Sequence, residues 1–134
     1  MKISPTLLQQ IQAHLEAGYP HEACGVMLGQ AGVITEIVPA GNQRTDSAHN
    51  RYLIDPRTYM QIERDADQRG RQVLGIYHSH PDVAALPSQF DLDNAWPDLS
   101  YLIVSVTKGK AVVSQCWRLA EAPRQFNPEP IEMT

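Results

Sequence analysis

Two stretches of the chain repeat apolar residues at the three- and four-residue intervals of an amphipathic helix, and each opens with a polar residue followed by proline. Ser4-Pro5 opens the first stretch, which predicts a helix that ends at Gly18. Asp55-Pro56 opens the second, which predicts a helix that runs to about Gln68 and is ended by Gly70. Both helices are therefore expected to bury one side against a core.

Short apolar runs bounded by glycine, proline or charged residues have the length of buried strands. These runs cover residues 23–29, 32–38, 51–54, 73–80, 101–107 and 111–119. A third, short helix is expected from Ser88 to Trp96, ended by Pro97. The order of these elements predicts an α/β fold in which one mixed β-sheet is sandwiched by helices.

We expect a single domain over residues 1–120, because a chain of 134 residues has about the length of one compact domain and no repeat is visible. Residues 121–134 contain three prolines, which predicts a loosely packed C-terminal tail. Residues 39–50 are a loop by composition, in which His49 and Asn50 are candidates for the lining of a substrate groove.

The charge of the chain bears on its partners, and its cysteine content bears on its cellular compartment. The net charge is −4 and the basic residues are scattered, which favours neither nucleic acid nor an anionic membrane. No apolar run has the length of a membrane span or the pattern of a signal peptide. Cys24 and Cys116 are expected to be reduced, so we expect a cytoplasmic protein. The sequence does not define its oligomeric state.

The candidate chemistry begins at His78 and His80. Alternate residues of a strand point to the same face, so the two imidazoles share a side and Ser79 points to the other. Two imidazoles at a strand end can hold one metal ion, although many strands that bind nothing also end in polar residues. The pair alone leaves both interpretations open.

Ser88 and Asp91 add a hydroxyl and a carboxylate at the start of the expected short helix. Their spacing fits a helix N-cap, although a capping box prefers Glu or Gln in place of the aspartate. It also allows Asp91 to join His78 and His80 as the third ligand of an open tetrahedral zinc site. Glu22, just before a buried strand, is a candidate base for a metal-activated water, or otherwise a surface glutamate.

This set of residues resembles the JAMM signature of the MPN+ metalloproteases. The signature is a glutamate, then His-Ser/Thr-His-Pro, then seven residues before a serine and two more before an aspartate. The matching residues here are Glu22, His78, Ser79, His80, Ser88 and Asp91. The likeness extends over about residues 3–118, which is nearly the whole of the expected domain.

The resemblance implies an MPN domain, an α/β/α sandwich related to the cytidine-deaminase architecture. It implies that His78, His80 and Asp91 bind Zn²⁺, with water as the fourth ligand. It further implies that Glu22 is the general acid and base, and that Ser88 hydrogen-bonds the oxyanion of a tetrahedral intermediate. The reaction that it implies is hydrolysis of a peptide or isopeptide bond.

The short segment between Asp91 and the next strand bears on the expected substrate. Only residues 92–100 separate Asp91 from the next strand, which leaves no room for one of the insertions that hold ubiquitin in deubiquitinating members. The chain looks more like the bacterial JAMM enzymes that act after the C-terminal Gly-Gly of small ubiquitin-like sulfur-carrier proteins, which implies a role in cysteine or other sulfur metabolism. The alternative is a non-catalytic zinc-bearing module that binds a ubiquitin-like partner.

Two histidines and one carboxylate also hold iron(II) in some oxygenases, but this alternative leaves Glu22 and Ser88 without a role. The remaining polar and aromatic residues near the motif are assigned no chemistry. Asp82 is expected to face solvent, and Trp96 and Trp117 are expected to be packing residues.

Overall fold

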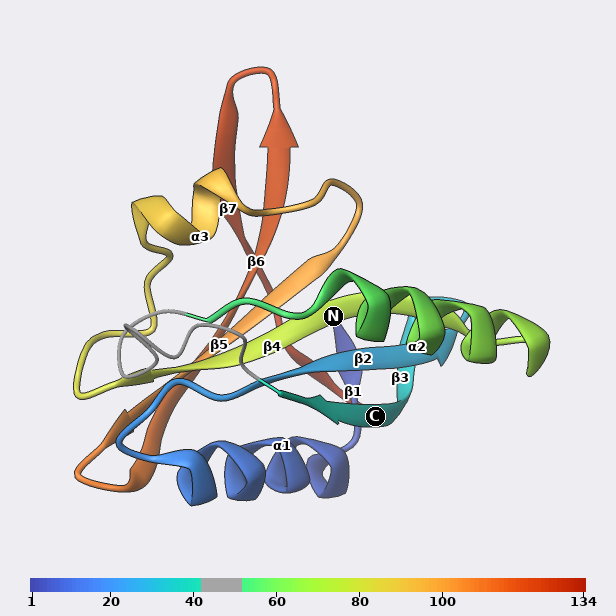
Figure 1. The fold of residues 1–134 in the computed structure, drawn as a ribbon. Coiled ribbons are helices and arrows are strands. Elements are labelled where there is room, and N and C mark those ends of the chain that lie inside the picture. Colours follow the sequence, from blue (N-terminus) through green and yellow to red (C-terminus); the bar gives the residue numbers. More distant parts are fainter. Residues whose placement is uncertain (42–51) are drawn as a thin grey trace.

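The computed structural model describes residues 1–41 and 52–134 of the chain (Figure 1). His49 and Asn50 lie outside the described residues. The helices are α1 (Pro5–Gly18), α2 (Pro56–Gln68) and α3 (Gln89–Asp93). The strands are β1 (Lys2–Ile3), β2 (Cys24–Gln30), β3 (Val33–Ala40), β4 (Gln72–Pro81), β5 (Ser100–Thr107), β6 (Lys110–Glu121), β7 (Arg124–Glu129) and β8 (Glu132–Met133).

The eight strands form one mixed sheet in the order β7-β6-β5-β4-β2-β3-β1-β8. The central strand, β4, pairs antiparallel with β2 and parallel with β5. A parallel pair cannot be joined by a tight turn, so the chain must cross the sheet between the end of β4 and the start of β5. This crossover contains α3.

Two apolar cores lie on opposite faces of the sheet, and Figure 1 shows α1 on one side and α2 on the other. The core under α1 contains Leu8, Ile11 and Leu15 of the helix together with residues such as Tyr77 of β4. The core under α2 contains Ala66 of the helix and residues of several strands. The alternation along β4 decides which of its side chains enters which core.

The two long helices confirm the sequence predictions, including their N-caps. The Ser4 hydroxyl accepts a hydrogen bond from the Leu7 N–H at 3.2 Å, and Pro5 occupies the first helical position. The Asp55 carboxylate accepts from the Arg57 N–H at 3.4 Å and caps α2 in the same way. The mixed sheet sandwiched by helices, predicted from the order of the elements, is also confirmed.

Three predicted elements differ in the structure. The third helix ends at Asp93, before Trp96, because the Asn94 side chain bonds back to the Phe90 carbonyl and the chain leaves helical geometry. Of residues 51–54, Ile54 alone takes part in a strand bridge among the described residues. The expectation of a loosely packed tail over residues 121–134 is wrong, because β7 and β8 lie within it and pair with the sheet.

The C-terminal hairpin of β6 and β7 also contacts the crossover. The Arg124 guanidinium, on β7, donates hydrogen bonds to the carbonyl oxygens of Leu92 at 2.8 Å and Ala95 at 3.0 Å. The Leu92 carbonyl belongs to the last turn of α3 and also accepts the Ala95 N–H at 3.4 Å, whereas the Ala95 carbonyl lies beyond the helix. The division of the chain at residue 120 stays a prediction, but residues beyond it hold the segment that follows α3.

Both cysteines are free and buried, as expected. Burial and the nearby Glu22 raise the pKa of the Cys24 thiol to about 12, so this thiol stays protonated at neutral pH. Among the described residues, no helix is long and apolar enough to cross a membrane.

Gly75 lies at the start of the parallel pairing, opposite Ser100. An added Cβ at this position would overlap the Ser100 carbonyl oxygen and lie 2.7 Å from Met27 Cε. We expect Gly75→Ala to lower the free energy of unfolding by about 1–3 kcal/mol, because the Ser100 backbone is fixed in β5. Denaturant unfolding measures this. Gly41→Ala is the control, because a Cβ there meets no described atom within 4 Å; equal stability of both variants would contradict the prediction.

Candidate metal centre

The site is built on the carboxyl end of β4. His78 and His80 lie on the α2 face of the sheet and are almost fully buried, with exposed fractions of 0% and 6%. Ser79 points to the opposite face, where its hydroxyl accepts a hydrogen bond from the Ala23 N–H at 3.0 Å. The same-side arrangement predicted for the two histidines is therefore present.

The crossover brings Asp91 to the two histidines. Asp91 Oδ2 lies 3.1 Å from His80 Nε2, and Asp91 Oδ1 lies 3.7 Å from His78 Nε2. Ser88 caps α3: its hydroxyl accepts from the Asp91 N–H at 3.0 Å, while the Ser88 N–H donates to Asp91 Oδ2 at 2.8 Å. The capping box and the approach of Asp91 to the histidines, two interpretations that the sequence left open, occur together.

Glu22 reaches the site through strand pairing. Cys24, at the start of β2, is the partner of His78 in the β2–β4 ladder, so the residues just before Cys24 lie next to the end of β4. Glu22 is only 5% exposed, and its Oε1 lies 3.6 Å from His78 Nδ1. It is therefore not a surface glutamate. Glu22, His78 and His80 each offer a ligand atom within 4.8 Å of the others.

The electrostatics of the site keep Asp91 ionised. Burial raises the pKa of the Asp91 carboxyl, but the hydrogen bond with His80, the nearby His78 and the Ser88 N–H together bring it down to about 2. For His80, burial lowers the pKa, but its hydrogen bonds with Asp91 and the Ala84 carbonyl outweigh this and leave the pKa above its usual value. Asp91 is thus a carboxylate at neutral pH, as metal binding requires.

One atom of the site indicates a place for a ligand. His78 Nε2 is buried and has no hydrogen-bond partner among the described residues, which is costly for a polar atom. A metal ion bonded to this nitrogen would satisfy it, and the neighbouring imidazole and carboxylate groups suit a divalent transition metal. The residues present therefore fit a metal ion. Two ligand sets are possible, one with Asp91 and one with Glu22, and both include His78 and His80.

Sequence reasoning missed several contacts at the site and in the loop that follows β4. Tyr52 stacks on the His78 ring with a centroid separation of 4.2 Å and an interplanar angle of 22°. Trp117, expected only to pack, donates a hydrogen bond from its indole N–H to the Ala85 carbonyl at 3.2 Å. Asp82 is exposed, as expected, but it also accepts hydrogen bonds from the Tyr19 hydroxyl and the Lys108 N–H. No local sequence pattern predicts these contacts, because each joins segments that lie far apart in sequence.

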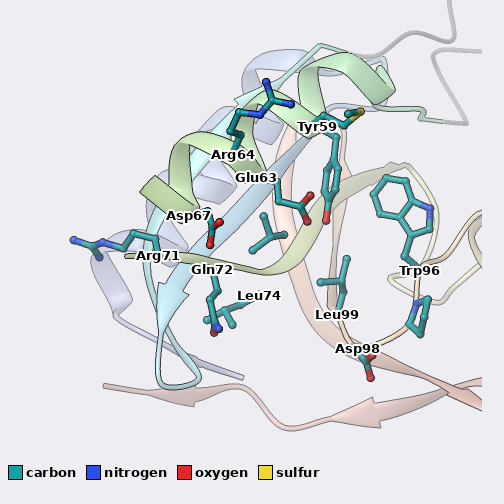
Figure 2. Close-up of a pocket in the computed structure, with 13 residues that line it drawn as sticks. Tyr59, Glu63, Arg64, Asp67, Arg71, Gln72, Leu74, Trp96, Asp98 and Leu99 are labelled. Atoms are coloured by element: carbon teal, nitrogen blue, oxygen red, sulfur yellow. The ribbon is translucent and has the colours of Figure 1, made fainter. Parts of the chain in front are cut away.

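A separate groove of about 830 Å³ lies along α2 and the start of β4 (Figure 2). Its lining includes Tyr59 and Glu63 of α2 and Trp96 and Leu99 of the crossover, and Figure 2 shows Tyr59 beside Trp96, with the two ring centroids 4.5 Å apart. None of the residues predicted for the site lines it. The cluster of histidines and carboxylates lies instead at the buried carboxyl end of β4.

The fold and the buried cluster of histidines and carboxylates define an MPN-type domain with a candidate metal centre. A family model described as prokaryotic homologs of the JAB domain matches residues 4–120, and the chain belongs to this family.

Curated relatives carry names of proteases. The chain is 34% identical over 97 residues, 72% of its length, to a probable TtuB-protein conjugate cleaving protease of Thermus thermophilus. It is 35% identical over 89 residues, 64% of its length, to a desampylase of Haloferax volcanii. The matches span 64% and 63% of these two relatives, less than two thirds of either. A CysO-cysteine peptidase of Mycobacterium tuberculosis is 29% identical over 77% of the chain and 71% of its own length.

Solved structures agree with the fold. A protein of Desulfitobacterium hafniense superposes with a TM-score of 0.85 at 27% identity, over 99% of this chain and 92% of that one. A JAB1/MPN domain protein of Archaeoglobus fulgidus superposes with a TM-score of 0.64 at 21% identity, over 100% of this chain and 96% of that one. The predicted MPN fold is therefore confirmed.

Both possible ligand sets include His80, so its replacement tests the metal centre itself. We expect His80→Asn to lower the affinity for a divalent transition-metal ion by roughly tenfold or more, because one imidazole ligand is lost. Competition with a chromophoric chelator measures this affinity, and circular dichroism checks folding. The control is His21→Asn, which changes an exposed histidine. A folded His80→Asn protein with parental affinity would argue against a metal centre at this place.

Proposed function

We propose that this protein is a zinc-dependent metallopeptidase of the JAMM type that cleaves a peptide or isopeptide bond after the C-terminal Gly-Gly of a small ubiquitin-like sulfur-carrier protein. The observation that carries the proposal is the meeting of two buried carboxylates, from Glu22 and Asp91, around the buried pair His78 and His80. Such a cluster can bind a metal ion and still leave one carboxylate for proton transfer.

We assign His78, His80 and Asp91 as the ligands of Zn²⁺. The Asp91 carboxylate lies close to Nε2 of both histidines, at 3.7 and 3.1 Å, whereas Glu22 Oε1 lies 3.6 Å from Nδ1 of His78, on the other side of that ring. The Nδ1 atom of His80 is occupied by the Ala84 carbonyl, so Nε2 is the side of that ring that faces the ligand set. When bound, zinc would polarise the scissile carbonyl and lower the pKa of a water molecule.

We assign Glu22 as the general acid and base. Its buried carboxylate lies beside the proposed metal ligands, with Oε1 3.6 Å from His78 Nδ1, and is therefore placed to take a proton from the attacking water. The same carboxyl group then gives this proton to the nitrogen of the leaving amine. The two carboxylates thus have separate roles: the Ser88 N–H holds that of Asp91 in place, and that of Glu22 transfers a proton.

We assign Ser88 as the donor to the oxyanion of the tetrahedral intermediate. Its oxygen accepts the Asp91 N–H, so the hydroxyl hydrogen remains available to donate in another direction. Ser88 is exposed at the first turn of α3, next to the buried ligand that this turn carries, so a substrate carbonyl can approach it. A donor placed before the reaction stabilises the charge that develops on the carbonyl oxygen.

The substrate class is supported by the relatives, whose names refer to the cleavage of TtuB conjugates, of CysO-cysteine and of the conjugates removed by a desampylase. We propose that this chain acts on the same chemical class, and that it does so in the cytoplasm as part of sulfur metabolism. A Gly-Gly tail has no side chains and suits a close approach to a buried site. Neither nucleic acid nor a membrane enters this proposal.

Replacement of each carboxylate separates the two assigned roles. We expect Glu22→Gln to bind zinc like the parent and to lose cleavage by about 10²–10⁴-fold, because it removes only the proton carrier. We expect Asp91→Asn to lose zinc as well as cleavage. The assay follows, by intact mass, the removal of residues that extend beyond Gly-Gly in a ubiquitin-like sulfur carrier.

The control is Glu121→Gln, which changes an exposed carboxylate on β6 and is expected to cleave like the parent. Loss of zinc from Glu22→Gln with zinc retained in Asp91→Asn would exchange the two roles. Binding of the carrier by the zinc-loaded parent without any cleavage would favour the non-catalytic binding module instead.

Ser88 has both a structural and a chemical role, and two variants separate them. We expect Ser88→Ala to lower kcat by about 10²–10³-fold, with zinc affinity changed far less, because a donor to the oxyanion is lost. Ser88→Thr keeps both the hydroxyl and the N-cap, and we expect it to retain much of the activity. Steady-state kinetics on the carrier substrate provide the test. A kcat for Ser88→Ala equal to that of the parent would limit Ser88 to its role as N-cap.

A further inference from the structure

The loop over residues 82–87, which we call the carbonyl loop, connects His80 to the N-cap of α3. Three successive backbone carbonyls of this loop each accept a hydrogen bond from a different side chain. The pairs are Ser105 Oγ to Val83 O at 2.6 Å, His80 Nδ1 to Ala84 O at 2.8 Å, and Trp117 Nε1 to Ala85 O at 3.2 Å. Side chains from three different strands, β4, β5 and β6, thus hold three consecutive carbonyls of this loop.

The sheet register explains why these side chains reach the loop. Ser105 on β5 is the direct partner of His80 in the parallel ladder, so both side chains leave the same face side by side. Trp117 lies on β6 opposite Tyr101, a residue of the core under α2, and so projects from this face too. Ser105 is only 5% exposed, so its hydroxyl must find a partner, and the Val83 carbonyl supplies it.

The middle hydrogen bond of the three decides how His80 presents its ring. A carbonyl oxygen can only accept, so the proton of this hydrogen bond is on His80 Nδ1. Nε2 is then the nitrogen that faces Asp91, at 3.1 Å. The position of the Ala84 carbonyl therefore sets both the tautomer and the orientation of His80, as outer hydrogen bonds do for metal-binding histidines in general.

We propose that Ser105 and Trp117 are positioning residues for the metal centre, because they hold the carbonyls on either side of Ala84 and so keep the Ala84 carbonyl aligned with His80 Nδ1. The inference rests on the proposed metal site and adds residues from two further strands to it. Neither side chain touches the reacting atoms. Both act through the carbonyl loop on the single ring nitrogen that faces away from the ligands.

The test compares zinc affinity in variants that remove only the two donors. Ser105→Ala removes the hydroxyl, and Trp117→Phe removes the indole N–H while it keeps an aromatic ring. We expect the double variant to bind zinc roughly 10–100-fold more weakly than the parent, the usual effect of losing outer partners of a metal site. The matched controls are Ser114→Ala, which removes a hydroxyl bonded to Gln12, and Trp96→Phe, and we expect parental affinity from both.

A second measurement, by NMR spectroscopy, begins with the parent protein, where it does not depend on the folding of any variant, and is then repeated on the double variant. Long-range ¹H–¹⁵N NMR of the zinc-loaded parent should show His80 protonated at Nδ1, with this proton protected from exchange. The Trp117 indole N–H should exchange more slowly once zinc is bound. In the double variant, the His80 ring signals should indicate a mixture of orientations or tautomers.

Each outcome bears on the inference. A folded double variant with parental zinc affinity and a parental His80 spectrum would overturn it. Protonation of His80 at Nε2 in the zinc-loaded parent would overturn it, as would a Trp117 N–H whose exchange is unchanged by zinc. Failure of the parent itself to bind zinc would overturn the proposed function together with this inference. Zinc binding without cleavage would affect only the proposed reaction.

Discussion

The parallel pairing of β4 with β5 is the constraint on which the site depends. Antiparallel neighbours can be joined by a turn, but this pair obliges the chain to travel from the end of β4 back to the start of β5. The returning chain packs its Ala95 and Leu99 in the core under α2, the same face from which His78 and His80 project. Because the crossover must pass over that face, an N-capped turn within it carries Asp91 to both imidazoles.

The sequence predicted those parts whose causes are local. Ser4-Pro5 and Asp55-Pro56 each contain the cap and the first helical residue, so both helices were placed closely. The motif residues other than Glu22 lie within one short stretch, and their spacing indicated both the capping box and the cluster. The placement of Glu22 depends on the β2–β4 register, a contact between distant segments that spacing alone does not reveal. The same reason explains the failure at residues 124–129, whose mostly polar sequence pairs with β6 as an edge strand.

The candidate metal centre places polar side chains in a buried region whose other side chains are mostly apolar. Four titratable side chains of the site are at least nine-tenths buried at the end of β4, next to cores of leucine, isoleucine and tyrosine. Such a cluster is expensive to bury unless its members satisfy one another. Here the Ser88 N–H, the Ala84 carbonyl and the stacked Tyr52 ring each fix one member. The fold thus holds the metal-binding side chains in place before a metal ion binds, so these side chains lose less conformational freedom on binding.

The contact between Arg124 and the end of α3 has a consequence for the history of this domain. The guanidinium holds the Leu92 and Ala95 carbonyls, so the length of the segment between α3 and β5 is matched to the reach of the C-terminal hairpin. An insertion between α3 and Ala95 would move the Ala95 carbonyl away from Arg124 while the Leu92 carbonyl stayed in place, so the guanidinium could no longer hold both. We therefore expect the length of this segment and the sequence of the hairpin to have changed together as related domains diverged.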